Sequence, residues 1–372
     1  MSLDNPLDPA MIPAELLARV EARGVSRRDF IKFCTATTAA LALPVSFVGK
    51  VAAAVADARV PVIWVEYQSC SGDSEAFLRA NQPTAAELIL DLISLEYAEV
   101  VMAAAGHQAE EAKRQAMKQY QGKYLLVVEG SVPTGADGAY CTIGGHSALD
   151  DCRMLARHAA AIICVGTCAS FGGIPAAAPN PTNAISVMEA VPGAPIVNLP
   201  GCPVNADNLT ATLVHFLTFG RLPATDALGR PKFAYGKRIH DNCERRGHFD
   251  AGQYAQAFGD HNHRQGHCLY QLGCKGPETF HNCPTIRYNE GVSWPVMAGH
   301  GCIGCSEPGF WDTMSPFYRR LPKVPGFGIE NTADQIGLGL AIATAAAFGV
   351  HGVASCFRKG DAMEEDKVVK ED

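Results

Sequence analysis

The stretch Val60-Pro61-Val62-Ile63-Trp64-Val65-Glu66-Tyr67-Gln68-Ser69-Cys70-Ser71-Gly72-Asp73 joins an apolar run to a polar turn that carries a thiol. Its first eight residues, 60–67, have the length and composition of a buried strand. Short apolar runs recur further along the chain, and we interpret each of them as another strand. They are residues 100–104, 124–128, 161–165 and 196–199.

Amphipathic segments lie between these runs, and the spacing of their apolar residues predicts helices. They cover residues 85–95, 109–121, 149–159, 184–190 and 205–219. Strands that alternate with helices along a chain form a parallel sheet covered by helices on both faces. We therefore expect residues 60–221 to form an α/β domain built on a doubly wound parallel sheet.

Three cysteines follow three of the predicted strands. Cys70 follows the first strand, Cys168 the fourth and Cys202 the fifth, each in a turn that contains glycine. Ligands bind beyond the carboxyl ends of the strands in sheets of this kind, so the three thiols should meet at one edge. Asp73, three residues after Cys70, is a candidate fourth donor. A cysteine can instead be a small buried apolar residue. We interpret four others in that way: Cys141, Cys152, Cys164 and Cys356.

A second group of donors lies in the later part of the chain, among glycine, proline and aromatic residues. It consists of His240, Cys243, Cys268, Cys274, Cys283, Cys302 and Cys305. Seven soft donors exceed the needs of one tetrahedral metal and suit two iron–sulfur clusters, one with four ligands and one with three. A zinc ribbon or a set of disulfides is the alternative, although zinc would normally use four or eight donors.

Composition limits the classes of function. The chain has 372 residues, 48% of them hydrophobic and 19% charged, which is typical of a globular protein with room for two domains. Its formal net charge of -7, without a basic stripe, argues against a nucleic-acid partner. The 14 cysteines are gathered unevenly, which suits metal binding better than a secreted disulfide scaffold. No G-x-G-x-x-G motif opens a helix after the first strand, and no Walker sequence is present, so nucleotide binding has little support.

The two ends of the chain have patterns of their own. Ser26-Arg27-Arg28-Asp29-Phe30-Ile31-Lys32 precedes an alanine-rich apolar run, 33–55, as in a twin-arginine export leader. We expect these first fifty-odd residues to lie outside the fold; an ordinary amphipathic helix is the alternative. Near the other end, residues 336–354 are about long enough to span a bilayer, and Arg358 and Lys359 follow them. A buried interface helix is the alternative there.

Six phrases of the sequence resemble the small, electron-transferring subunit of nickel–iron hydrogenases. They are SRRDFIKFCTAT (26–37), PVIWVEYQSCSG (61–72), GTCASFGG (166–173), LPGCP (199–203), CLYQLGCKGP (268–277) and GHGCIGCSEPGFWD (299–312). The resemblance runs from the leader almost to the last residues. It implies a twin-arginine-type leader at 1–58, a flavodoxin-like domain at 59–222, a Cys-rich iron–sulfur domain poor in regular structure at 223–330, and a C-terminal helix with an acidic tail at 331–372.

The same resemblance implies three iron–sulfur clusters, each held by one set of donors. The proximal set, for a [4Fe–4S] cluster, is Cys70, Asp73, Cys168 and Cys202. The distal set, for a second [4Fe–4S] cluster, is His240, Cys243, Cys268 and Cys274. The medial set, for a [3Fe–4S] cluster, is Cys283, Cys302 and Cys305. Glu66 and Glu75 would lie near the proximal cluster.

Asp73 departs from the family's usual pattern, which has a second cysteine at this point. It resembles the actinobacterial-type, high-affinity uptake branch, in which an aspartate completes the proximal site. A carboxylate is a harder donor than a thiolate. Oxygen-tolerant membrane members carry two extra cysteines beside the proximal cluster, and Gly72 and Gly173 stand at those positions here. The alternative is that Asp73 is a bystander and that water completes the cluster.

The resemblance also implies partners and a location. Hydrogen would be split at a nickel–iron centre in an obligate large subunit, because this chain lacks the paired C-x-x-C motifs that hold those metals; no catalytic residue is expected here. Electrons would leave for an external acceptor, such as a membrane cytochrome or a quinone-linked carrier, and the complex would be a dimer of heterodimers. The two chain ends favour a membrane-associated protein exported to the periplasmic or outer face. A cytoplasmic protein that retains its leader is the alternative.

Two other functions compete with this interpretation. One is the iron–sulfur subunit of another redox complex, similar to the quinone-reductase subunit of respiratory complex I, which would share only the amino-terminal domain. The other is a zinc-binding structural module, whose cysteines would be structural and whose protein would be colourless.

Overall fold

The computed structural model describes residues 12–22, 26–57, 59–80, 84–85, 88–89, 93–321 and 333–368. The chain divides into two compact units. The first consists of Met1–Glu244 and Gly273–Arg320, and the second of Arg245–Leu272 and Leu321–Asp372. Every named strand of the described chain belongs to the first unit.

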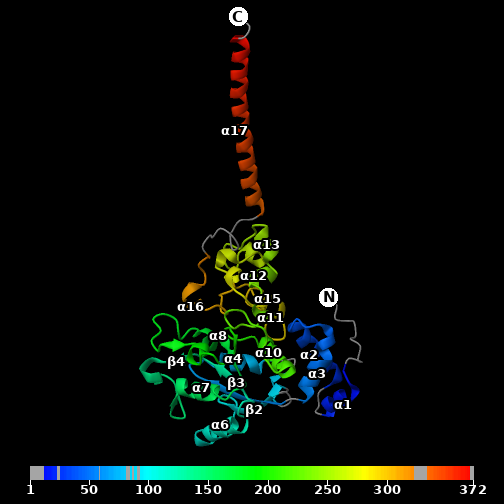
Figure 1. Ribbon diagram of the computed structural model, residues 1–372, viewed down its shortest axis with the longest axis vertical. Helices are drawn as coiled ribbons and strands as arrows, with labels where there is room; N and C mark the ends of the chain where they lie inside the picture. Colours follow the sequence, from blue (N-terminus) through cyan, green and yellow to red (C-terminus); the bar gives the residue numbers. More distant parts are fainter. Residues whose placement is uncertain are drawn as a thin grey trace. The chain divides into compact units, whose positions relative to one another are not determined.

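Five parallel strands form the central sheet of the first unit (Figure 1). They are β1 (Val60–Glu66), β2 (Ile93–Ala98), β3 (Leu125–Glu129), β7 (Ala161–Val165) and β9 (Ile196–Leu199). Their order across the sheet is β2-β1-β3-β7-β9. Counted along the chain, this is the 2-1-3-4-5 order of flavodoxin-like sheets, so the predicted α/β fold class is confirmed.

Helices and short strands complete the first unit. The longer helices, of six residues or more, are α1 (Ala14–Ala22), α2 (Arg27–Ala40), α3 (Val48–Asp57), α4 (Gly72–Leu78), α6 (His107–Gln119), α7 (Ala148–Ala156), α8 (Gly166–Phe171) and α10 (Ala206–Phe219). The shorter ones are η2 (Val45–Phe47), η4 (Gly135–Gly138), α9 (Val187–Ala190), α11 (Lys232–Tyr235), α12 (Ile239–Asn242), η6 (Gly276–Glu278), α15 (Cys283–Ile286) and α16 (Phe310–Thr313). Two small antiparallel ladders pair β4 (Val132–Pro133) with β8 (Ala184–Ile185), and β5 (Thr142–Ile143) with β6 (His146–Ser147).

The second unit has little regular structure apart from one long helix. Its helices are α13 (Arg246–Asp250), α14 (His261–Arg264), η5 (Tyr270–Leu272) and α17 (Ala333–Val368). A small aromatic core holds the shorter segments together, with the rings of Phe249, Tyr254 and Tyr270 in contact with one another.

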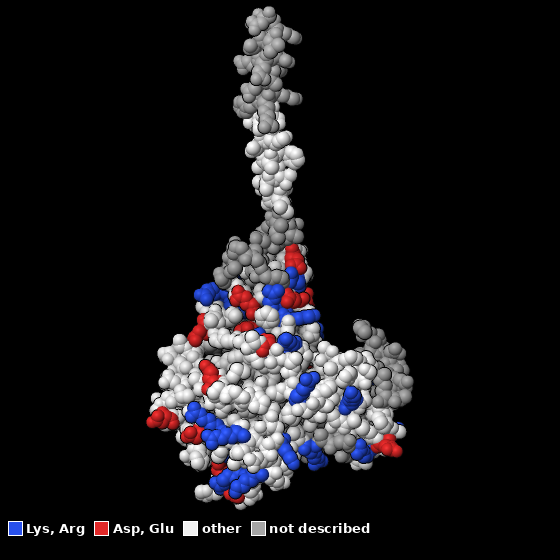
Figure 2. Space-filling view, in the orientation of Figure 1, with Lys and Arg blue, Asp and Glu red and all other residues white. Residues whose placement is uncertain are grey.

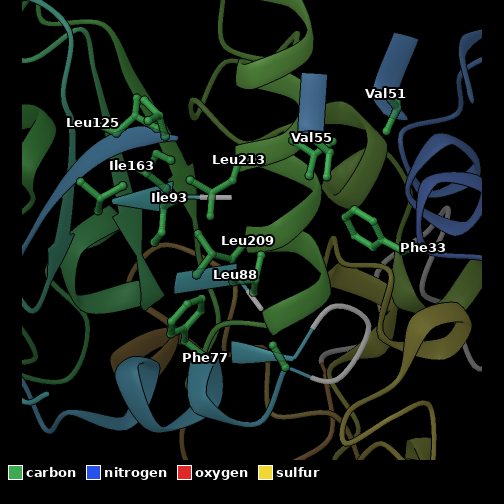
Figure 3. Packing of buried hydrophobic residues seen from close by; sticks show 14 of the residues in the cluster. Phe33, Val51, Val55, Phe77, Leu88, Ile93, Leu125, Ile163, Leu209 and Leu213 are labelled. Carbon is green, nitrogen blue, oxygen red and sulfur yellow. The ribbon is translucent and has the colours of Figure 1, made fainter. Parts of the chain in front are cut away.

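Side chains of the central strands alternate between two cores, which is why both faces of the sheet are covered. Leu125 of β3 packs in one core with Leu209 and Leu213 of α10 (Figure 3). Leu126, its neighbour in the chain, packs in the other core with Cys152 of α7. The helices on the two faces thus meet a sheet that is apolar on both sides.

The four cysteines interpreted as small buried residues have different outcomes. Cys152 and Cys164 are fully buried, as predicted. Cys141 is only half-buried. The side chain of Cys356 lies outside the described residues.

One predicted strand and two predicted helices differ from the structure. Residues 100–104 form turns and bends rather than a strand, and Val100 and Val101 are each 46% exposed. The strand at this edge is β2, whose first residues pair with Val60 and Val62 of β1. The predicted helix 85–95 therefore ends in a strand; some of its other residues lie outside the described ones. The predicted helix 184–190 divides into β8 and α9.

The twin-arginine motif lies at the start of helix α2. Ser26 caps this helix, because its Oγ accepts a hydrogen bond from the N–H of Asp29 (3.2 Å). The Arg27 guanidinium lies 3.1 Å from the carboxylate of Glu21 in α1. Local capping and pairing therefore make this stretch helical.

The amino-terminal helices pack onto the first unit, contrary to the expectation that they lie outside the fold. Phe33 of α2 and Val51 and Val55 of α3 join the core that contains Leu209 and Leu213 of α10 (Figure 3). The physical reason is that α3 has an apolar face of valine and alanine, and α10 presents an apolar face to it. Docking on the body and a role in export are separate properties, and the export role stays a prediction.

Helix α17 contains the apolar run near the carboxyl terminus. Gly337–Ser355 comprises 19 residues with a mean hydropathy of 1.6, and none of the stretch is buried. This stretch contains no Asp, Glu, Lys or Arg, and Figure 2 shows no charged side chain along it. Its length and composition are therefore sufficient to cross a membrane.

Cys34 provides a test of the docked amino-terminal helices. Its side chain is 0% exposed, and burial raises the pKa of its thiol to about 12, so it should resist alkylation in the native full-length chain. Val51→Asp places a charge in the core and should speed labelling of Cys34 about tenfold or more, measured by peptide mass spectrometry. Lys50→Asp, at an exposed neighbouring position on α3, is the matched control. Rapid labelling of the unmodified protein would contradict the docked arrangement.

Candidate functional site

The three strand-end thiols come together at the carboxyl edge of the sheet. Cys70 follows β1, Cys168 lies in α8 directly after β7, and Cys202 follows β9. Hydrogen bonds tie two of these turns to each other: the N–H of Thr167 donates to the carbonyl of Gly201 (2.8 Å), and the N–H of Gly201 donates to Thr167 Oγ1 (2.9 Å). The sequence prediction of a common edge is therefore met.

Electrostatics shows how closely these donors gather. Burial, followed by the negative charges of Cys305, Cys168, Asp73 and Cys70, raises the pKa of the Cys202 thiol to about 12. Burial likewise raises the pKa of Cys168 to about 12. Such thiols stay neutral unless a cation compensates their charge, so the group fits a metal centre.

Asp73 lies in the first turn of α4 and is only 7% exposed. Its Oδ1 accepts a hydrogen bond from the N–H of Val204 (2.6 Å). Its Oδ2 occupies the place that a Cβ would need at Gly166, which has a positive φ of 78°. Burial, followed by the charge of Glu129, raises the pKa of Asp73 to about 7. A carboxyl group held in this way fits a site that receives a cation.

Glu129, the last residue of β3, organises the turn that carries Cys70, and sequence reasoning missed it. It is 1% exposed and accepts hydrogen bonds from the N–H groups of Asp73 (3.1 Å) and Ser74 (2.8 Å) and from Ser69 Oγ (2.7 Å). An acidic residue at the end of an otherwise apolar buried strand was the signal that could have found it.

The two glutamates predicted near this site differ in their surroundings. Glu66 accepts hydrogen bonds from Ser71 Oγ (2.6 Å) and Ser74 Oγ (2.9 Å), and burial raises its pKa. Glu75 is exposed, and its carboxylate lies 3.9 Å from the guanidinium of Arg79. Glu66 therefore belongs to the buried network around Glu129, whereas Glu75 faces solvent.

The medial set lies around a cavity of about 500 Å³ in the first unit. Cys283, Cys302 and Cys305 line this cavity together with Cys202 of the proximal set. Thr167 Oγ1 donates a hydrogen bond to the carbonyl of Cys305, which fixes this loop against the strand-end turns. Burial raises the pKa of all three medial thiols. The cavity is thus lined by the buried Cys283 and Cys302, the half-buried Cys305 and the exposed Cys202.

His281 lines the same cavity and was also missed from the sequence. It is 1% exposed, and burial, followed by the charge of Arg230, lowers its pKa to about 3. Its Nε2 has no hydrogen-bond partner among the residues that the structure describes. A buried polar atom left unpaired at a thiol-lined cavity fits a site that an inorganic group completes. The spacing His281-x-Cys283 was the available signal.

The distal set is divided between the two units. His240, Cys243 and Cys274 belong to the first unit, where His240 is buried in α12. Cys268 belongs to the second unit, in whose small core it is buried with Tyr270. The convergence of these four donors stays a prediction.

The described cysteines are available as ligands. All thirteen whose side chains the structure describes are free thiols, so the alternative of a disulfide framework is not what the described chain contains. Within the same described residues, no three His, Cys, Asp or Glu side chains are placed to hold a single metal ion.

Two protein families match successive parts of the chain. Residues 70–216 match the family described as "NADH ubiquinone oxidoreductase, 20 Kd subunit". Residues 235–318 match the family described as the C-terminal part of the NiFe/NiFeSe hydrogenase small subunit. The first match covers most of the sheet domain, and the second covers the medial set and the distal set.

Similar proteins are found over nearly the whole chain. The quinone-reactive Ni/Fe-hydrogenase small chain of Wolinella succinogenes is 49% identical over 350 residues, which cover 91% of this chain and 98% of that one. The uptake hydrogenase small subunit of Azotobacter vinelandii is 46% identical over 338 residues, covering 91% of this chain and 94% of the relative.

Solved structures agree with the sequence comparison. The reduced, active Ni-Fe-Se hydrogenase of Desulfomicrobium baculatum matches with a TM-score of 0.68 and 36% identity, over 71% of this chain and 100% of that one. The actinobacterial-type NiFe-hydrogenase of Ralstonia eutropha H16 matches with a TM-score of 0.65 and 28% identity, over 78% and 91% of the two chains. These likenesses establish the family rather than a branch within it. The chain belongs to the small-subunit family of nickel–iron hydrogenases, the electron-transferring partners of a large subunit.

Proposed function

We propose that this chain carries electrons from H2 oxidation in the large subunit to an external acceptor, by way of two [4Fe–4S] clusters and one [3Fe–4S] cluster. The observation that carries the proposal is the cavity lined by thiols of both the proximal and the medial sets. When bound, the clusters would supply a series of one-electron carriers. The proximal, medial and distal sets defined above would hold them.

The chain's own contribution is to fix the positions of the donors; Asp73 is buried, whereas Cys70 and Cys202 are exposed. Glu129 holds the turn after β1 through the N–H groups of Asp73 and Ser74. The N–H of Val204 holds the Asp73 carboxylate. Because the thiols and Asp73 have raised pKa values, they favour their neutral forms until iron compensates their charge.

A direct hydrogen bond joins the medial set to a member of the distal set. The N–H of Cys302 donates to Cys274 Sγ (3.2 Å), and the N–H of Lys275 donates back to the Cys302 carbonyl (2.7 Å). Lys275 is 2% exposed, and its Nζ donates to the carbonyls of Gly273, Phe317 and Arg319. This arrangement supports a rigid junction between the two sets.

Gly301 allows that junction to form. A Cβ at this position would lie 2.9 Å from Cys274 Cα and 3.1 Å from Cys274 Cβ, closer than two carbon atoms normally approach. The residue before Cys302 therefore has no space for a side chain.

Several features support a membrane-linked acceptor. The helix Gly337–Ser355 is long and apolar enough to anchor the protein, and the relative from Wolinella succinogenes is named quinone-reactive. We propose a quinone-linked or cytochrome acceptor in the membrane, export by the twin-arginine-type leader, and a dimer of heterodimers. Uptake of H2 is the direction that the names of several relatives favour.

Asp73 supports the proposal that this chain has an actinobacterial-type proximal site. The carboxyl group is buried beside the strand-end thiols, where the usual pattern has a cysteine. Gly72 and Gly173 argue separately against the two extra cysteines of oxygen-tolerant membrane members, because a Cβ would meet Cys70 Sγ at 3.1 Å and Cys168 Sγ at 2.6 Å respectively. A cysteine at either position would crowd the thiols already present.

The alternative functions have less support. A subunit similar to that of complex I accounts for the match over residues 70–216 but not for the hydrogenase match over residues 235–318. A zinc-binding module would explain the thiols of the later segment but not the three that gather at the edge of the sheet.

Metal analysis tests the proposed function. The complex co-purified with its large subunit should be brown and contain about 12 irons per small subunit: about 11 from the two four-iron clusters and the three-iron cluster, and one from the nickel–iron centre of the large subunit. An iron content near eight per small subunit would mean that the medial or the proximal cluster is wrongly assigned. A colourless complex with one or two zinc ions would end the proposal.

Asp73→Ala tests the proximal assignment. Loss of a ligand should change the spectrum of the proximal cluster and leave the distal spectrum as it was, measured by electron paramagnetic resonance (EPR). Asp73→Cys should retain a four-iron signal, because a thiolate is a suitable ligand. Asp207→Ala, at an aspartate that lines the cavity, is the matched control. An unchanged proximal signal in Asp73→Ala would mean that the carboxylate is not a ligand.

Gly301→Ala tests the junction. The added methyl group should push Cys302 away from Cys274 and weaken the hydrogen bond to its sulfur, which should lower the reduction potential of the distal cluster. Gly247→Ala is the control, because a Cβ there meets nothing within 4 Å. Potentials are measured by EPR-monitored redox titration. Equal potentials in the two variants, with iron retained, would contradict the role of this hydrogen bond.

A further inference from the structure

The two ring nitrogens of His281 differ in their surroundings. Nδ1 contacts Cys283, whereas Nε2 has no hydrogen-bond partner among the described residues. Its Nδ1 lies 3.0 Å from the backbone nitrogen of Cys283, which donates its N–H to the ring. The same Nδ1 is 3.0 Å from Cys283 Sγ. Because Nδ1 accepts a hydrogen bond, the ring carries its proton on Nε2. His281 therefore presents an N–H donor from its far side.

That donor has nothing to bind within the described chain. Nε2 is buried and has no hydrogen-bond partner among the described residues, although the side chain lines the cavity of about 500 Å³. Buried N–H groups are almost always paired in folded proteins. The missing acceptor must therefore be a group that enters the cavity.

The ring cannot easily turn toward another acceptor. It stacks edge-on against Tyr235, with the ring centroids 4.9 Å apart. Tyr235 is itself held, because its hydroxyl donates to the carbonyl of Pro200 (2.8 Å). The backbone N–H of His281 donates to the carbonyl of Lys237 (3.2 Å), which fixes the main chain at this point. The direction of Nε2 is thus set before any ligand binds.

The residues that line this cavity indicate that the acceptor for the Nε2–H hydrogen bond is sulfur. Cys283, Cys302 and Cys305 line it, and Cys283 is two residues from His281. Hydrogen bonds to the sulfurs of an iron–sulfur cluster are one of the means by which a protein sets its reduction potential. They stabilise the more negative, reduced state, and so raise the potential.

We propose that His281 is a positioning residue for the medial site, holding Cys283 through Nδ1 and donating Nε2–H to a sulfur of the bound cluster. This inference rests on the proposed function, since it requires a cluster held by Cys283, Cys302 and Cys305. His281 is not a ligand in this arrangement. It adjusts the potential and the geometry of a site that the three thiols hold.

Three substitutions separate the two interactions. His281→Gln places an amide N–H near the position of Nε2 and should keep the medial potential close to that of the unmodified protein. His281→Asn places an amide near Nδ1, so it should retain the Cys283 contact but lower the medial potential. His281→Phe keeps the ring against Tyr235 and loses both hydrogen bonds, so it should lower the medial potential and reduce, without abolishing, the medial iron content.

The measurement is an EPR-monitored redox titration of the intact complex, together with iron analysis of each variant. His158→Asn, at a histidine outside the cavity lining, is the control. The proximal and distal potentials should stay unchanged in all four variants. Equal medial potentials in His281→Gln, His281→Asn and His281→Phe would overturn the inference.

The two proposals fail in different ways. If the unmodified complex lacks iron or a medial signal, the proposed function fails and the histidine has no cluster to contact. If the unmodified complex has its iron and its three signals but His281→Asn and His281→Phe leave the medial potential unchanged, only the role of His281 is wrong.

Discussion

Glu66, Glu129, Val165 and Leu199 are aligned at the carboxyl ends of four neighbouring parallel strands. Because the strands run in the same direction and end level with one another, the turns that follow them begin side by side. Three of these turns carry Cys70, Cys168 and Cys202 within a few residues of the strand ends. A shift of one strand by a single residue would reverse which side chains enter each core, so the two apolar cores hold the register and, with it, the site.

This arrangement raises the pKa of donors that a metal site needs in their charged forms. Burial of Asp73 and partial desolvation of Cys168 and Cys202, followed by negative charges nearby, raise the pKa of all three groups. Such groups resist ionisation until a cation arrives, which couples the ionisation of the site to metal binding. Glu129 stabilises this turn, because its carboxylate accepts hydrogen bonds from two N–H groups that the turn would otherwise leave unpaired.

Backbone and side-chain N–H groups recur as the means of holding each donor. The N–H of Val204 donates to Asp73 and the N–H of Cys302 donates to Cys274 Sγ. His281 lines the cavity, and its Nε2 has no partner among the described residues. These N–H groups are neutral. They can therefore stabilise negatively charged sulfur and oxygen atoms without placing a second ion in the site. The proposed relay would therefore depend on residues beyond the ligands themselves.

The sequence by itself determined the alternation of strands and helices, the strand-end turns with their thiols, and the family. Each of these follows from the spacing of neighbouring residues or from short sequence motifs. The β2 strand was missed since residues 93–98 are less uniformly apolar than residues 100–104, and only pairing with β1 decides between them. The docking of α2 and α3 and the roles of Glu129 and His281 likewise depend on neighbours distant in the chain. Local patterns specify which side chains avoid water, but long-range packing decides which of them meet, and the buried polar contacts of the site arise only from that second step.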